Sequence, residues 1–239
     1  MIIMRILFIA FFAANISFAQ ILPSWFLNKP DTNYSYYYGL VETGDYYSET
    51  SYKSAFEKAC ENAAQSVKLT YFIDQTFISA GGAKSWANYK ADIVYDTSLT
   101  EYFMNSLSIA DSFQTKDYTI VIASNTSEKI THKNIDITQL ARPEWVDVLP
   151  ESDKYFYAMG TSVEYYHIVS SWDQAEKVAR LELARQQNLT MKQIQKVTES
   201  SYYDITNEVT KATLRSVQTV ARWVDPKKKL YYVLLQMPK

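Results

Sequence analysis

One pattern of residues occurs twice in this chain, 120 positions apart. Each copy has a proline, then a tryptophan, a second proline, an aromatic stretch ending near a glycine, and alanines spaced along a helical pattern. The recurring residues are Pro23, Trp25, Pro30, Gly39, Ala55, Ala59 and Ala64 in one copy, and Pro143, Trp145, Pro150, Gly160, Ala175, Ala179 and Ala184 in the other. Only the glycine recurs at 121 positions. A repeat at a fixed period predicts two similar folding units within the 239 residues.

Each copy shows the same order of secondary-structure patterns. Aromatic-rich first strands are expected at 34–41 and 154–161. Small and apolar residues at steps of three and four predict helices at 50–73 and 171–197. Alternating apolar residues predict two final strands in each copy, at 107–113 and 118–124, and at 217–223 and 230–237. The expected fold class is α+β, with two tandem strand–helix–strand–strand modules, each a helix packed on a three-stranded antiparallel sheet.

The N-terminus has the pattern of a secretory signal peptide. Arg5 precedes an apolar run at 6–14, and small residues stand at Ser17 and Ala19. This run is too short to span a bilayer and favours cleavage after Ala19. The expected division is therefore a signal peptide at 1–19, a first module at 20–124, a polar linker at 125–141 and a second module at 142–239. We expect an exported protein, in the periplasm or at the periphery of the outer membrane of a Gram-negative-type bacterium.

The repeated residues have structural explanations. The prolines keep residues 21–33, and their counterparts around Pro143 and Pro150, extended. Trp25 and Trp145 are interpreted as anchors that hold these segments against their own modules, and the alanines as positions where the helix approaches the sheet. Residues 77–97, which contain Gly81 and Gly82, are predicted to form a flexible loop whose extra length makes the first copy about ten residues longer. The second helix is expected to present a solvated outer face, formed by Glu176, Lys177, Arg180, Glu182 and Arg185.

The sequence offers little catalytic chemistry. Cys60 is the only cysteine, so no intramolecular disulfide can form, and we expect a buried thiol. The two histidines, His132 and His167, are not part of a metal-ligand motif, and no serine-nucleophile motif is present. The net charge of −2 gives no basic footprint for nucleic acid. We therefore predict no enzymatic activity, no catalytic residues, no cofactor and no metal.

The doubled order of Pro-x-Trp, proline, aromatic strand with glycine, and Ala-x-x-x-Ala helix resembles the bacterial lipoprotein-20 family. That family comprises exported envelope proteins related to the N-terminal domain of flagellar assembly protein T. The resemblance covers 23–124 and 143–237, and it implies a helix packed across a three-stranded antiparallel sheet in each copy. It supplies no catalytic residues. The apolar run is not followed by a lipid-accepting cysteine, which departs from the lipoprotein members and leaves only peripheral membrane association open.

Two functional hypotheses follow from these features. The first is a non-enzymatic exported envelope protein that acts through protein–protein interaction or assembly, with envelope proteins or further copies of itself as partners. The alternative is a glycan- or peptidoglycan-binding module that uses some of its 20 tyrosines, together with Trp86 and Trp172, for stacking. The candidate interaction surface lies outside the repeated pattern, at Tyr46, Tyr47, Trp86, Tyr165 and Tyr166.

Overall fold

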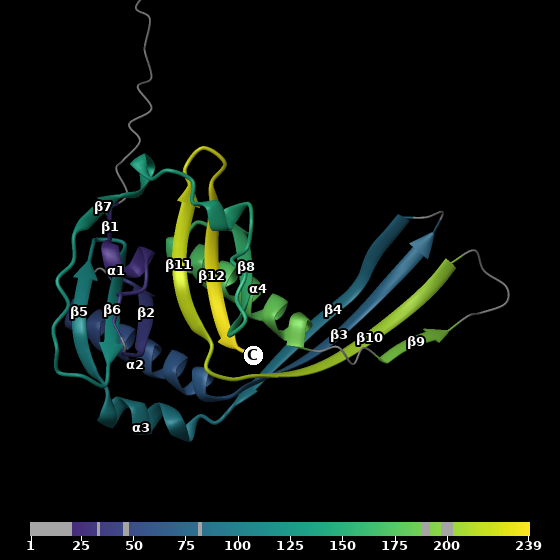
Figure 1. The fold of residues 1–239 in the computed structure, drawn as a ribbon, viewed down its shortest axis with the longest axis horizontal. Helices are drawn as coiled ribbons and strands as arrows, with labels where there is room; N and C mark the ends of the chain where they lie inside the picture. Colours follow the sequence, from purple (N-terminus) through teal and green to yellow (C-terminus); the bar gives the residue numbers. More distant parts are fainter. Residues whose placement is uncertain (1–20, 33, 45–47, 81–82, 188–191, 197–202) are drawn as a thin grey trace, which may run out of the picture.

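The computed structural model (Figure 1) describes residues 21–32, 34–44, 48–80, 83–187, 192–196 and 203–239. It shows an α+β fold in which helices pack on small antiparallel sheets, as the sequence predicts. Two compact bodies, one from each copy of the repeat, lie side by side, and a long sheet projects from them.

The body of the first copy is a three-stranded antiparallel sheet with a long helix on one face. The strand order is β2-β6-β5. Helix α2 (Ser48–Val67) covers the sheet, and helix α3 (Ser98–Ser106) lies against α2, where Phe56 and Phe103 close a small apolar cluster around Cys60. The strands are β2 (Tyr36–Glu42), β5 (Ser108–Gln114) and β6 (Tyr118–Ser124).

The second copy repeats this body without a counterpart of α3. Its strand order is β11-β12-β8, and helix α4 (Ile168–Gln187) packs on β8 and β12. Both sheets even share an irregularity, because the register shifts between Ile109 and Asp111 in β5 and between Thr219 and Ala221 in β11. The strands are β8 (Tyr155–Val163), β11 (Gln218–Asp225) and β12 (Leu230–Pro238). The duplication is therefore preserved in the backbone, down to the position of a bulge.

Each helix approaches its sheet closely at the repeated glycine. A Cβ atom on Gly39 would lie 1.7 Å from the carbonyl oxygen of Ala55, and one on Gly160 would lie 1.9 Å from that of Ala175. Ala55, Ala59, Ala175 and Ala179 are all fully buried at this contact. Glycine on the strand and alanine on the helix thus allow the two backbones to pack against each other, which larger side chains at these positions would prevent.

The opposite face of each sheet is covered by the segment that precedes its first strand. In the first copy, Trp25 is buried in the one-turn helix α1 (Ser24–Leu27), stacked on Tyr38 of β2 with ring centroids 6.3 Å apart. In the second, Val146 in the 3-10 turn η2 (Glu144–Val146) packs with Trp223 and Tyr232, and the half-buried Trp145 lies beside them. A short ribbon of β1 (Ile21–Pro23) and β7 (Asn134–Asp136), followed by η1 (Ile137–Gln139), completes the cover.

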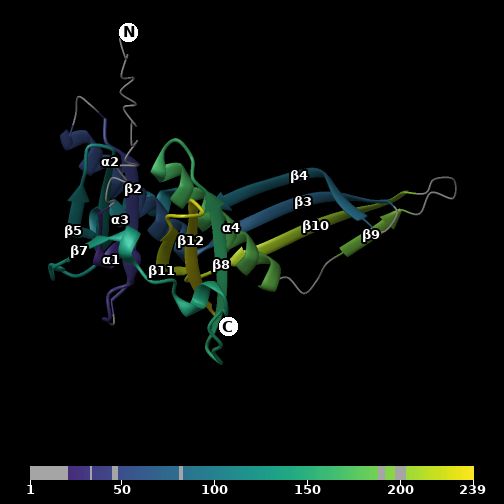
Figure 2. The same cartoon turned by 90° about the horizontal axis from the view of Figure 1, so that it is seen from above.

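A four-stranded antiparallel sheet, here called the arm, extends well beyond both bodies (Figures 1 and 2). It combines one hairpin from each copy in the order β4-β3-β10-β9. Its centre is the pairing of β3 with β10, which runs from Leu69 opposite Leu214 to Ala80 opposite Tyr203. The strands are β3 (Leu69–Ala80), β4 (Ala83–Tyr95), β9 (Lys192–Lys196) and β10 (Tyr203–Leu214).

The arm corrects several predictions. The expected loop at 77–97 is wrong, because β3 and β4 occupy most of it and only Gly81 and Gly82, which lie outside the described residues, separate them. A Gly-Gly pair between two strand-forming segments is a hairpin signal. The first helix ends at Val67 instead of 73, and the second ends at Gln187 instead of 197, because Leu69–Ala80 and Lys192–Lys196 pair as strands within the arm.

Three further expectations are corrected. The extra length of the first copy lies in α3, which falls between β4 and β5 and has no counterpart between β10 and β11. The lead-in at 21–33 is not extended throughout, because Ser24–Leu27 form a helical turn. The polar linker at 125–141 contains β7, whose pairing with β1 gives it a structure that its own sequence does not favour. The predicted signal peptide lies outside the described residues.

The close contact at the glycine generates a stability prediction. Replacing Gly160 with alanine places a Cβ 1.9 Å from Ala175 O and 2.3 Å from Ala179 N, so the helix backbone must move. Gly160→Ala should lower the free energy of unfolding by about 1–3 kcal/mol or more. The matched control is Gly44→Ala, where an added Cβ meets nothing within 4 Å. Urea denaturation measures both, and equal stability of the two variants would contradict the packing described.

Candidate functional site

The repeated residues form the contacts between helix, sheet and lead-in. Pro23 and Pro143 immediately precede α1 and η2, in extended conformation with φ near −70° and ψ near 145°. Trp25 also donates a hydrogen bond from Nε1 to Asp111 Oδ2 at 2.7 Å. Trp25 and the repeated glycines and alanines are buried, so they position other groups, whereas Pro143 and Trp145 are half-buried and Pro150 is exposed.

The predicted interaction residues are separated by the fold. Tyr165 and Tyr166 lie in the β8–α4 connection and are exposed, Tyr166 to 96%. Trp86 lies on β4 in the arm, and its side chain is not among those described. Tyr46 and Tyr47 lie outside the described residues. Among the predicted residues whose side chains are described, Tyr165 and Tyr166 lie together.

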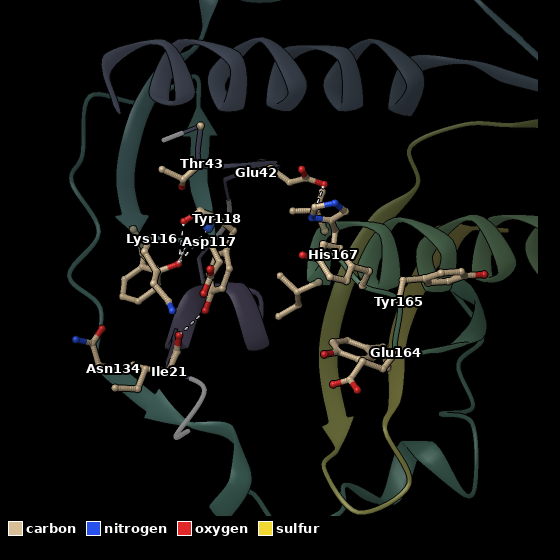
Figure 3. Close-up of a pocket in the computed structure, with 17 residues that line it drawn as sticks. Ile21, Glu42, Thr43, Lys116, Asp117, Tyr118, Asn134, Glu164, Tyr165 and His167 are labelled. Atoms are coloured by element: carbon tan, nitrogen blue, oxygen red, sulfur yellow. Dashed lines mark hydrogen bonds and ion pairs between the residues drawn. The ribbon is translucent and has the colours of Figure 1, made fainter. Parts of the chain in front are cut away.

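These two tyrosines stand at a cleft of about 1170 Å³ between the two bodies (Figure 3). The first copy contributes the end of β2, the β5–β6 turn and the β1–β7 ribbon, and the second contributes the β8–α4 connection and Tyr231. The lining residues are Ile21, Glu42, Thr43, Gly44, Phe113, Thr115, Lys116, Asp117, Tyr118, Asn134, Glu164, Tyr165, Tyr166, His167, Ile168, Val169 and Tyr231. Sequence analysis did not predict the cleft because its walls come from segments that are distant in the chain.

The polar groups of the cleft form pairs across and along it. His167 Nδ1 lies 3.3 Å from Glu42 Oε1, which joins the second copy to the first, but both side chains are about half exposed. Lys229 Nζ lies 2.7 Å from Glu164 Oε2 at the rim. Exposed ion pairs contribute little free energy. The cleft therefore presents carboxylate, imidazole, amide, hydroxyl and aromatic groups, which can form hydrogen bonds with a polar ligand.

Beneath the cleft, a buried arginine joins the two copies. The guanidinium carbon of Arg222, on β11, lies 4.2 Å from the ring centroid of Phe26 and 4.7 Å from that of Tyr38. Its Nη1 donates to the carbonyl oxygen of Phe26 at 3.0 Å. Phe26 also meets Trp172 edge-on, at 5.5 Å between centroids. A cation enclosed by two aromatic rings and a carbonyl is well suited to a buried position.

Glu176 lies between two arginines at this contact. Its Oε1 accepts from Arg180 Nη2 at 2.6 Å, and its Oε2 lies 3.4 Å from Arg222 Nη2. Arg180 also donates to Gln65 of α2, which links helix to helix. Burial alone would raise the pKa of Glu176, but the charges of Arg180 and Arg222, with the Arg180 hydrogen bond, outweigh it and hold that pKa below its usual value.

The prediction of a solvated outer face on the second helix is therefore wrong for two of its five members. The Glu176 side chain is 18% exposed and that of Arg180 is 12% exposed, because this face of α4 meets the first copy. Trp172 is buried to 3% exposure on the same helix, so it is not available to stack on a sugar. Glu182 and Arg185 do pair near the surface.

A second network holds the linker against the first copy. His132 Nδ1 contacts Asp111 Oδ2, the same oxygen that accepts from Trp25 Nε1. The imidazole meets the rings of Trp25 and Phe113 edge-on, at 6.2 and 6.0 Å between centroids. These contacts fix the linker to Trp25. The sequence predicted only a polar linker, since nothing local marks Asp111 as a partner of His132.

The described part of the chain contains neither a metal-binding cluster nor an exposed thiol. No three His, Cys, Asp or Glu residues among those described are placed to hold a metal ion. Cys60 is fully buried, and burial, with the nearby charge of Glu57, raises the pKa of its thiol to about 11. A protonated thiol of this kind is a poor nucleophile at neutral pH. Among the described helices, none is long and apolar enough to cross a membrane.

The edges of the arm are the other candidate surface. Within the described strands, β4 pairs only with β3, and β9 pairs only with β10. Near its base, β4 exposes Ile93 to 46% and Val94 to 57%. An edge strand presents unpaired backbone N–H and C=O groups, which is a template for adding another strand. The sequence signal for this surface was the Gly81-Gly82 hairpin.

Comparisons with protein-family models, with curated proteins and with solved structures found no match to this chain. The resemblance to the lipoprotein-20 family therefore stays a prediction from the repeated residues.

The buried carboxylate generates a prediction with a pH dependence. Glu176→Gln leaves two buried guanidinium groups without their counter-charge and should cost about 3–5 kcal/mol of unfolding free energy at pH 7. Because the folded pKa of Glu176 is lowered, its contribution is complete above the unfolded value, about 4.3, and is lost as pH falls through the folded one. The deficit of the variant should therefore shrink on acidification below about pH 4.

Denaturant titrations from pH 7 to pH 3 measure this difference. Glu182→Gln, in a pair near the surface with Arg185, is the matched control and should change stability by less than about 1 kcal/mol. A deficit of Glu176→Gln that is equally small, or that grows as the pH falls, would show that the carboxylate does not stabilise the contact between the copies.

Proposed function

We propose that this chain is a non-enzymatic exported envelope protein that acts through protein–protein interaction, and that the arm is the element that contacts its partner. The observation that carries the proposal is the projection of a four-stranded sheet away from both bodies (Figure 1). Strands of 12 and 13 residues in β3 and β4 extend well past the helices that cover the two body sheets. A long sheet with unpaired edges is prone to aggregate unless another polypeptide pairs with those edges.

The two bodies hold the base of the arm together. The strands at its centre, β3 and β10, come from different copies, and the contact around Arg222 and Glu176 holds these copies together. A partner that pairs with the arm therefore meets a template whose direction is fixed relative to both bodies. Export to the envelope rests on the signal-peptide pattern at 1–19, and the assembly role agrees with the family that the repeat resembles.

Shortening the arm tests the proposal. Asp74 lies opposite both Lys90 and Val209, so one cut across the sheet at this level removes the distal part. In this variant, Asp74 joins Lys90 through an Asn-Gly turn, and a short Gly-Ser linker joins Gln187 to Val209. The buried residues of both bodies lie outside the deleted segments. We expect the variant to fold and to lose the proteins that crosslink to the full chain in the bacterial envelope.

The control for this experiment is Tyr102→Ala, an exposed substitution on α3 that leaves the arm intact. Circular dichroism and thermal unfolding establish that the shortened variant is folded. Capture of the same envelope proteins by the shortened chain would contradict the proposal.

The cleft favours a second candidate function, the binding of a glycan or peptidoglycan fragment. Tyr166 is almost fully exposed at its mouth, and Glu42, Asn134 and Glu164 offer hydrogen-bonding groups around it. An exposed aromatic ring beside polar groups is the usual arrangement for stacking on a sugar.

Removal of the ring tests this candidate. If soluble peptidoglycan fragments bind in the cleft, Tyr166→Ala should weaken their affinity about 2- to 10-fold, as expected for a stacking contact worth about 0.5–1.5 kcal/mol. Isothermal titration calorimetry measures the affinity, with Tyr102→Ala as the exposed-tyrosine control. No binding by the unmodified protein, or equal affinity of both variants, would exclude the cleft as a glycan site.

A further inference from the structure

The duplication makes the two hairpins of the arm equivalent, strand by strand. Helix α2 ends at Val67 and α4 ends 120 positions later at Gln187, so each hairpin follows the same end of the repeated helix. The first strand of each hairpin is β3 or β9, and the second strand is β4 or β10. Lys192 on β9 stands 120 positions after Phe72 on β3.

The contact between the hairpins is not symmetric. It joins the first strand of one copy, β3, to the second strand of the other, β10. A contact between two different surfaces of equivalent units leaves the complementary surfaces free at the two ends. The free edges here are β4, a second strand, and β9, a first strand, as far as the described strands extend.

We propose that β9 of one molecule pairs with β4 of a second copy of this chain, repeating the β3–β10 contact between molecules. The order β4-β3-β10-β9 then continues as β4-β3-β10-β9 in the next molecule. The directions agree, because β3 and β9 both run antiparallel to the strands β4 and β10. Such head-to-tail pairing forms a ring if it closes and a filament if it does not. This inference rests on the proposed function and identifies the partner.

The existing contact also predicts the register of the new one. Phe72 is opposite Asp92 in the first hairpin, and Lys192 is opposite Val209 in the second, so Asp92 corresponds to Val209. Phe72 pairs across the copies with Lys211, two residues after Val209. The corresponding intermolecular pair is therefore Lys192 opposite Val94, also two residues after Asp92.

Two of the other edge strands, β5 and β11, are already contacted along part of their length by other segments of the same chain. Beside β5, Ile130 N donates to Ala110 O at 3.3 Å and Lys129 Nζ donates to Ile109 O at 2.6 Å. Beside β11, Lys29 N donates to Val220 O at 2.9 Å, next to the bridge of Asn28 with Ala221.

Paired cysteines test this contact in the full chain. The variant carries Val94→Cys and Lys192→Cys, with Cys60→Ala to remove the native thiol. Opposite residues in antiparallel strands lie about 4.5–5.5 Å apart at Cα, within the range of a disulfide. Within one molecule, β4 and β9 are three strand spacings apart, about 14 Å, so the same disulfide cannot close. Mild oxidation should give a ladder of dimers, trimers and larger species on a non-reducing gel.

Four control samples define the outcome. Val94→Cys alone and Lys192→Cys alone should give no species larger than a dimer, and an equimolar mixture of the two should give mixed dimers only. Tyr102→Cys combined with Lys192→Cys places the first thiol on α3, outside the arm, and should give no ladder. Circular dichroism shows that each variant is folded.

The absence of a ladder from the folded double variant would overturn the proposal. Equally strong crosslinking of Val94→Cys alone would overturn it in favour of a symmetric β4–β4 contact. Failure here is distinguishable from failure of the proposed function: a chain that forms no ladder, yet loses its envelope partners when the arm is shortened, uses the arm to bind a different protein.

Discussion

The pairing of β3 with β10 is the interaction on which the rest of this structure depends. It joins hairpins from two copies of a repeated unit through residue pairs that run from Leu69 with Leu214 to Ala80 with Tyr203. A two-stranded hairpin is only marginally stable in water, so neither hairpin would extend this far alone. Together they form one sheet, whose direction is set by the bodies at its base. The arm is therefore a product of the duplication and not of either copy.

The buried contact around Glu176 and Arg222 shows how the two copies have diverged. The positions in α2 that correspond to Glu176 and Arg180 are Phe56 and Cys60, 120 residues earlier, and both belong to the apolar cluster that α3 covers. The second copy has no helix between β10 and β11 that corresponds to α3. The same face of α4 carries the pair of Glu176 and Arg180, which meets Arg222 and Gln65. In the first copy, α3 covers this face of α2. In the second copy, the first copy itself covers the corresponding face of α4.

The sequence predicted those parts of the fold that depend on local pattern. The body strands, the two helices and the close approach of their alanines to the sheets follow from periodicity and from small residues at a repeated spacing, whereas the contacts at Gly39 and Gly160 emerge only in the structure. The arm could not be predicted from any single segment, because 192–196 continues a helical pattern and becomes a strand only through its pairing with β10. The same holds for Arg180 and Glu176, whose i, i+4 spacing is typical of an exposed pair but whose surroundings come from the first copy. The cleft at Tyr165 and Tyr166 also needs both copies.

Amide hydrogen exchange measured as a function of protein concentration tests the central claim most directly. At low concentration, the central strands β3 and β10 should exchange slowly, while β4 and β9 exchange faster through their unpaired edges. As the concentration rises, protection should appear on β4 and β9 together, and on no other edge. Exchange at β4 and β9 that does not change with concentration, or rapid exchange along β3 and β10, would contradict the account of a single sheet that joins the two copies and continues between molecules.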